Sequence, residues 1–213
     1  MALSITTPPT TEPVALQDVK DALRLTSTAD DARITRLISV ARRYAEKVVN
    51  RSLVPKTYTE YFDRFPRWND FPESYRDGGR SPLYLSAPPL IAVVSVSYLD
   101  PETMQLVTWD ASQYYVSPAG MRDEATIQPN PGCDYPSTAR VRGAVTVQYQ
   151  AGFGYSNGTG TQITEPLDEQ VAEGILRLAV HLYEHPDPVT ESVLRESPVD
   201  FSTFFGAGRR RSF

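Results

Sequence analysis

The chain has 213 residues, enough for one domain of ordinary size with a sizeable core, or for one domain and an arm. Its net charge of −5 argues against a dedicated duplex-DNA binder, and its single cysteine excludes an internal disulfide and a cysteine-rich zinc site. No apolar run approaches the ~20 residues that cross a bilayer, and the first residues lack a secretion-signal pattern. We therefore expect a protein made in the cytoplasm and without a membrane partner.

The N-terminal quarter predicts an arm and two helices. Residues 1–13 are rich in threonine and proline and predict an extended arm. Apolar residues at helical spacing predict helices over residues 16–25 and 29–49. The second helix has an apolar stripe, in which we expect Leu37 and Ile38 to be core residues, and a basic remaining surface. That basic surface is formed by Arg33, Arg36, Arg42, Arg43 and Lys47.

The middle of the chain, residues 57–149, predicts a β-rich section. Alternating and β-branched segments predict strands over 57–63, 83–85, 91–99, 106–109, 113–116, 125–128 and 141–149. A long charged loop, residues 64–82, interrupts them and carries the aromatic residues Trp68, Phe71 and Tyr75. These three aromatics leave open a β-rich module that binds carbohydrate or peptide.

A closing helix is predicted over residues 165–184, with Thr164 as its cap and Pro166 in its first turn. An arm then follows over residues 189–213. The whole pattern predicts an α+β fold with an N-terminal helix pair, an antiparallel β meander, a closing C-terminal helix and an extended arm. Its domain would span residues 14–188.

One motif offers catalytic chemistry. His181, Glu184 and His185 match the H-x-x-E-H pattern of zinc peptidases, in which two histidines one helical turn apart share a metal. His181 and His185 are the only histidines in the chain, and the motif lies at a predicted helix end directly before Pro186. A zinc-dependent hydrolase therefore stays an alternative, and we expect no enzyme, no catalytic metal and no cofactor.

The layout as a whole resembles the head–tail connector (adaptor, or head-completion) proteins of tailed bacteriophages. The resemblance covers about residues 14–195. It rests on the order and spacing of five segments: ALQDVKDALRL at 15–25, DDARITRLISVARRYAEKVVNRSL at 30–53, LYLSAPPLIAVVSVSYLD at 83–100, VTVQYQAGFG at 145–154 and PLDEQVAEGILRLAVHLYEH at 166–185. The chain departs from the family pattern in its loop at 64–82 and in a tail that ends in RRRSF.

This resemblance implies a structural virion protein, assembled in the host cytoplasm and placed at the head–tail interface. Such proteins form a ring under the portal, typically of twelve subunits, which extends the DNA channel and holds the next tail or stopper component. Genomic DNA would pass through without sequence-specific binding, and the acidic balance of the chain agrees with a wall that repels phosphates.

Charge and aromatic residues single out the C-terminal arm. Residues 151–208 carry two basic and nine acidic groups, after which three arginines follow at once. We expect the arm to bind the portal through the set Phe201, Phe204, Phe205, Arg209, Arg210, Arg211 and Phe213. The alternative is that the phenylalanines fold back onto their own subunit. Trp68, Phe71 and Tyr75 are the expected contacts to the next tail component.

Overall fold

The computed structural model describes residues 2–67, 81–116, 125–155, 164–185 and 205. The chain divides into two units. The β unit comprises Met1–Pro8 and Pro55–Glu165, and the helical unit comprises Pro9–Val54 and Pro166–Phe213. The domain expected over residues 14–188 stays a prediction, because a division of the chain into compact units does not test whether these residues fold as one domain.

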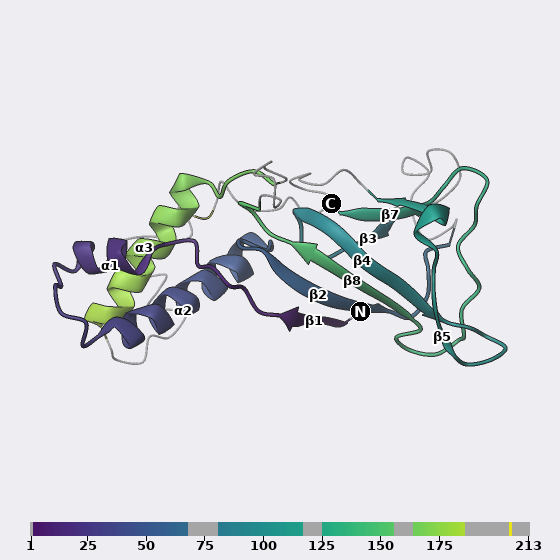
Figure 1. Ribbon diagram of the computed structural model, residues 1–213, viewed down its shortest axis with the longest axis horizontal. Coiled ribbons are helices and arrows are strands. Elements are labelled where there is room, and N and C mark those ends of the chain that lie inside the picture. Colours follow the sequence, from purple (N-terminus) through teal and green to yellow (C-terminus); the bar gives the residue numbers. More distant parts are fainter. Residues whose placement is uncertain (1, 68–80, 117–124, 156–163, 186–204, 206–213) are drawn as a thin grey trace. The chain divides into compact units, whose positions relative to one another are not determined.

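The larger sheet of the β unit has five antiparallel strands (Figure 1). Its spatial order is β1 (Ala2–Thr7), β2 (Lys56–Phe62), β8 (Val145–Ala151), β4 (Leu90–Leu99) and β5 (Leu106–Thr108). Strands β2 and β8 pair without interruption from Lys56 opposite Ala151 to Phe62 opposite Val145. Alternate side chains of both strands are buried, so one face of this sheet lies on a core.

A smaller sheet supplies the opposite side of that core. It has the order β3 (Leu83–Tyr84), β7 (Thr126–Pro129) and β6 (Tyr114–Val116), with a short 3₁₀ helix, η4 (Ala111–Gln113), before β6. Buried side chains from both sheets form one apolar cluster, in which Leu83 and Ile127 of the small sheet join Val96, Val147 and Tyr149 of the large one. The β unit therefore has a single core between two sheets.

The helical unit consists of α1 (Leu16–Ala22), α2 (Asp31–Val49) and α3 (Glu169–Glu184) (Figure 1). Helices α2 and α3 each bury one apolar stripe, as their period predicts. Polar contacts join the start of α2 to the other two helices. The ammonium of Lys20 in α1 lies 2.7 Å from a carboxylate oxygen of Asp31, and the hydroxyl of Tyr183 in α3 donates to Asp30 at 2.9 Å. None of the helices in the described ranges is long and apolar enough to cross a membrane.

The predicted α+β class and the antiparallel pairing are confirmed. Two details differ from the expectation. Residues 2–7 of the expected arm form β1, which pairs with β2 at the edge of the sheet. In a meander each strand lies beside its neighbour in the chain, whereas β8 lies between β2 and β4 because it pairs with both of them.

Helix boundaries differ from the sequence prediction for local reasons. Helix α1 ends at Ala22 rather than at residue 25, because Arg24 adopts a left-handed backbone conformation with φ of 56°. Helix α3 begins at Glu169, and its cap is Asp168, which accepts from the backbone N–H of Gln170 at 2.9 Å. The expected cap, Thr164, instead accepts from the backbone N–H of Tyr155.

Arg42 was expected on the solvent side of α2 and is buried instead. Its Nε lies 2.7 Å from a carboxylate oxygen of Glu12, and its Nη1 lies 3.0 Å from one of Glu46. Glu46 also accepts from the backbone N–H of Leu53 at 3.2 Å. The arginine therefore fixes the segment before α1 and the segment after α2 to the middle of α2.

Candidate functional site: an arginine-lined pocket

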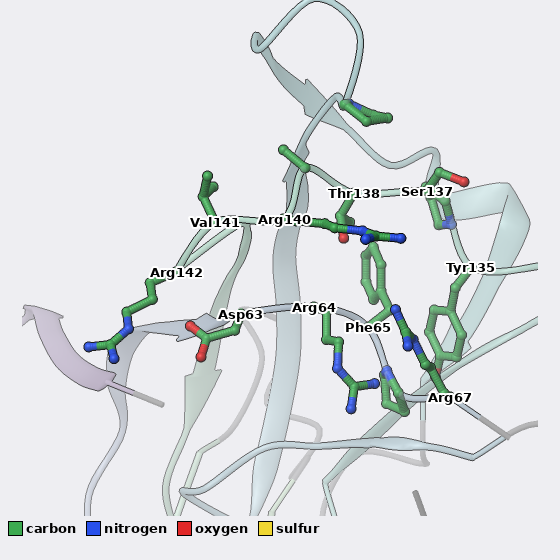
Figure 2. Close-up of a pocket in the computed structure, with 14 residues that line it drawn as sticks. Asp63, Arg64, Phe65, Arg67, Tyr135, Ser137, Thr138, Arg140, Val141 and Arg142 are labelled. Carbon is green, nitrogen blue, oxygen red and sulfur yellow. The ribbon is translucent and has the colours of Figure 1, made fainter. Parts of the chain in front are cut away.

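The β unit contains an open pocket of about 650 Å³ beside the ends of β2 and β4 (Figure 2). Two segments supply most of its lining, residues 63–67 directly after β2 and residues 135–142 before β8. Pro101 adds one further wall residue. The volume lies in the range of about 300–1,000 Å³ that is typical of ligand pockets.

Backbone and side-chain hydrogen bonds hold the 135–143 segment in place at three points. The hydroxyl oxygen of Tyr135 lies 2.9 and 3.0 Å from the carbonyl oxygens of Ser81 and Ile127, which share its one proton. The backbone N–H of Ala139 donates to the carbonyl of Leu99 at 2.9 Å. The backbone N–H of Gly143 donates to the carboxylate of Asp63 at the same distance. Both ends and the middle of this segment are thus attached to other parts of the β unit.

Aromatic packing forms the base of the pocket. Phe65 is buried and stacks on Tyr135 with ring centroids 4.9 Å apart. The ring of Trp109 contacts Phe65 edge to face, with ring centroids 5.3 Å apart, and the ring centroids of Trp109 and Tyr114 lie 4.7 Å apart. Burial raises the pKa of Tyr135, so its hydroxyl stays a neutral donor at physiological pH. This cluster belongs to the core of the β unit, which makes the base of the pocket rigid.

The charge of the pocket is opposite to that of the chain. Four arginines and a single acidic residue, Asp63, line it, although the net charge of the chain is −5. The four are Arg64, Arg67, Arg140 and Arg142. In Figure 2, Arg142 lies at the end that holds Asp63, and Arg140 extends toward Ser137 and Tyr135. Guanidinium groups bind carboxylates and phosphates with two parallel hydrogen bonds, so the pocket has the chemistry of an anion site.

Sequence reasoning did not single out these arginines. The available signals were short: RFPR at 64–67 and RVR at 140–142. The two segments are more than 70 residues apart in the chain, and only the pairing of β2 with β8 brings them together. The expected contact residues Trp68, Phe71 and Tyr75 lie outside the described residues.

The C-terminal arm is represented by Phe205 alone. Its side chain is fully buried in the helical unit and meets the ring of Tyr44 in α2 edge to face, with centroids 6.2 Å apart. At this residue the structure therefore agrees with the alternative stated above, in which a phenylalanine of the arm folds back onto its own subunit. The other members of the expected portal-binding set lie outside the described residues: Phe201, Phe204, Arg209, Arg210, Arg211 and Phe213.

The histidine motif lies at the end of α3. The rings of His181 and His185 stack with centroids 4.5 Å apart. Burial, and then the charge of His185, lower the pKa of His181 below its ordinary value, while Glu184 acts in the opposite direction. No group of three or more histidine, cysteine, aspartate or glutamate side chains is placed to hold a metal ion in the part of the chain that the structure describes.

A family model matches the N-terminal third of the chain. The model of a family described as phage gp6-like head-tail connector protein matches residues 13–80. This segment resembles phage head–tail connectors. The match contains α1 and α2 of the helical unit and β2 of the β unit. The resemblance predicted from the sequence is thereby confirmed over these residues. No curated protein matches the sequence of the chain.

Solved structures resemble the chain over its full length. A chain from the neck of an empty gene transfer agent (GTA) particle, computed with C6 symmetry, has a TM-score of 0.70 at 18% identity. Chains from the native GTA virion and from the native neck computed with C12 symmetry each have a TM-score of 0.68, at 19% and 18% identity. Each alignment covers 100% of this chain and 97% of the other. At these identities the likeness establishes the fold.

Proposed function

We propose that this protein is a structural virion connector: it forms a ring under the portal, extends the DNA channel and joins the head to the tail. The observation that carries the proposal is the match of residues 13–80 to the head-tail connector family. The full-length similarity to chains of a GTA virion and its neck supports it independently, since that similarity extends to both units.

A ring of twelve subunits is the oligomer that we propose. The similar neck chain was resolved with C12 symmetry, and a head-to-tail contact between identical subunits closes into a ring. The protein would be made and assembled in the host cytoplasm. Its place in the particle would lie between the portal and the next tail or stopper component.

For the channel, we propose a wall that DNA passes without sequence-specific binding. The net charge of −5 supports this role, because carboxylates repel the phosphates of a moving duplex. A structural role of this kind requires neither catalysis nor a cofactor, and we propose none.

The C-terminal arm remains our proposed portal contact, with a changed role for one residue. Phe205 is buried against its own subunit, so we propose that it anchors the arm. The free contacts would then be Phe201 and Phe204 on one side of the anchor and Arg209, Arg210, Arg211 and Phe213 on the other. The arginines would bind carboxylates of the portal, and the phenylalanines would fill apolar pockets.

Removing the protein from particle production tests the proposal. Without it, we expect heads that carry no tails, and expression of the chain from a second gene copy should restore complete particles. Electron microscopy of the purified particles gives the ratio of tailed to tailless heads. Tailed, infectious or DNA-transferring particles in normal number without the protein would contradict the connector role.

A further inference from the structure

We propose that the arginine-lined pocket binds an acidic peptide segment of a second copy of this chain, and that residues 186–200 are that segment. The inference rests on the proposed ring, in which copies of the chain are neighbours. It assigns a place on each subunit where one copy is recognised by the next.

The first argument is charge complementarity. The pocket lining carries four arginines against one aspartate. The sequence of residues 186–200, PDPVTESVLRESPVD, carries four carboxylates against one arginine. The carboxylates are Asp187, Glu191, Glu196 and Asp200. The exposed guanidinium groups of Arg140 and Arg142 can each bind one carboxylate through two hydrogen bonds.

Arg140 and Arg142 are the two arginines best placed for such a ligand. Both are exposed, and neither forms a hydrogen bond or ion pair with another residue in the described ranges. The backbone between them is nevertheless fixed, because Ala139 and Gly143 on either side donate to Leu99 and Asp63. An ordered backbone with exposed guanidinium groups lowers the entropic cost of binding an anionic segment.

The apolar part of the pocket favours a peptide over a nucleic acid. Phe65, Pro66, Tyr135, Pro136 and Val141 line it beside the arginines. Residues 186–200 also contain valine, leucine and proline between the carboxylates, so their sequence includes apolar side chains suited to the same surface. A DNA duplex is too wide to enter a pocket of about 650 Å³ and would contact only its rim.

A pocket and its ligand on different parts of one chain generate a head-to-tail contact. Each subunit would insert its acidic segment into the pocket of one neighbour and receive the segment of the other neighbour. Such heterologous contacts close into rings when the rotation between copies permits it. Individual carboxylate–arginine pairs are modest in energy, but a closed ring makes every contact at once.

Charge reversal tests the inference in assembled particles. The pocket variant carries Arg140→Glu and Arg142→Glu, and the segment variant carries Glu191→Lys and Glu196→Lys. We expect each variant to fold with wild-type thermal melting and to reduce the copies per purified particle at least tenfold, as measured by quantitative mass spectrometry. The chain that carries all four changes should be incorporated as the wild type is. The matched control, Arg36→Glu with Arg43→Glu on exposed positions of α2, should leave incorporation unchanged.

Co-expression of the pocket and segment variants shows which copy supplies the segment. In an alternating ring, both kinds of contact pair opposite charges, so co-expression should restore incorporation. Failure of co-expression together with rescue by the fourfold variant would place the contact within one chain and overturn the inference between copies.

Other outcomes also decide the question. Normal incorporation of the pocket variant overturns the inference, and so does a loss of incorporation that the fourfold variant does not restore. In both cases, incorporation of the wild-type chain still supports the connector role. The pocket would be assigned to DNA instead if the pocket variant lost binding to a 20-base-pair duplex and the segment variant left both DNA binding and incorporation unchanged. Absence of the wild-type chain from particles would reject the connector role and the inference together.

Discussion

The hydroxyl of Tyr149 on β8 donates a hydrogen bond of 2.9 Å to the carboxylate of Glu60, which is fully buried on the adjacent strand β2. Ser86 supplies two further donors to the same carboxylate, its backbone N–H at 3.0 Å and its hydroxyl at 2.5 Å. Burial, and then the charge of Glu60, raise the pKa of Tyr149, so the hydroxyl remains a donor. Three donors thus satisfy a carboxylate that would otherwise be costly to bury.

The Tyr149→Phe substitution removes one of these donors and retains the ring. We expect the free energy of unfolding to fall by about 1–3 kcal/mol, the range for hydrogen bonds to charged groups. Urea denaturation followed by circular dichroism measures the change. The control is Tyr115→Phe, which removes an exposed hydroxyl that donates to Gln128 and should cost less than about 0.5 kcal/mol. Equal costs at the two positions would show that the Glu60 network does not stabilise the core.

Two neighbouring residues of α2 give a second comparison. The sequence predicts both Leu37 and Ile38 as core residues, but only Ile38 is buried, with 2% of its surface exposed, while Leu37 is partly buried. Ile38→Ala should therefore cost about 2–5 kcal/mol of unfolding free energy, and Leu37→Ala clearly less. The same denaturation experiment orders them. A larger loss at Leu37 would mean that the buried face of α2 is rotated from the one described.

Arg42 should be the arginine of α2 on which stability depends. Replacing it with alanine leaves Glu12 and Glu46 without their buried partner, and we expect a loss of about 2–4 kcal/mol, since Glu12 keeps part of its solvent exposure. Arg43→Ala removes an exposed neighbour and should change stability by less than about 0.5 kcal/mol. Similar melting temperatures for the two variants would contradict the role of the ion pairs.

Periodicity predicted the elements of this fold well because it reports local burial. The helical stripe around Ile34 and Ile38, and the alternation in β8, arise from residues a few positions apart, and the structure confirms both. Arg42 escaped prediction because its partner Glu12 is 30 residues away. β1 escaped because its apolar side chains Leu3 and Ile5 are exposed, which leaves no buried face to create a pattern.

The pocket could not have been predicted by the same reasoning. Its arginines are ordinary surface residues by composition, and their gathering depends on the register of β2 with β8. The wall around them depends on backbone contacts such as Ala139 with Leu99, to which side-chain chemistry contributes nothing. A single sequence contains no signal for either.

The burial of Phe205 allows the folding of the helical unit and the proposed portal contact of the C-terminal arm to be tested separately. Phe205→Ala removes a buried ring from the helical unit and should cost about 3–5 kcal/mol, which lowers the melting temperature measurably. Deletion of residues 206–213 keeps that ring and should leave melting unchanged while it reduces attachment to portal-bearing heads. Calorimetry and head-binding assays measure the two effects. Normal head attachment after this deletion would reject residues 206–213 as a portal contact.

The central claim, a connector ring at the head–tail interface, is tested most directly by electron cryomicroscopy of complete particles. A reconstruction of the neck should show density for the β unit and the helical unit of this chain repeated in a closed ring directly below the portal. We predict twelve copies, a number that agrees with the C12 symmetry of the neck from which one similar chain comes. A neck whose density is fully accounted for by other chains, with this protein absent from the particle, would contradict the account.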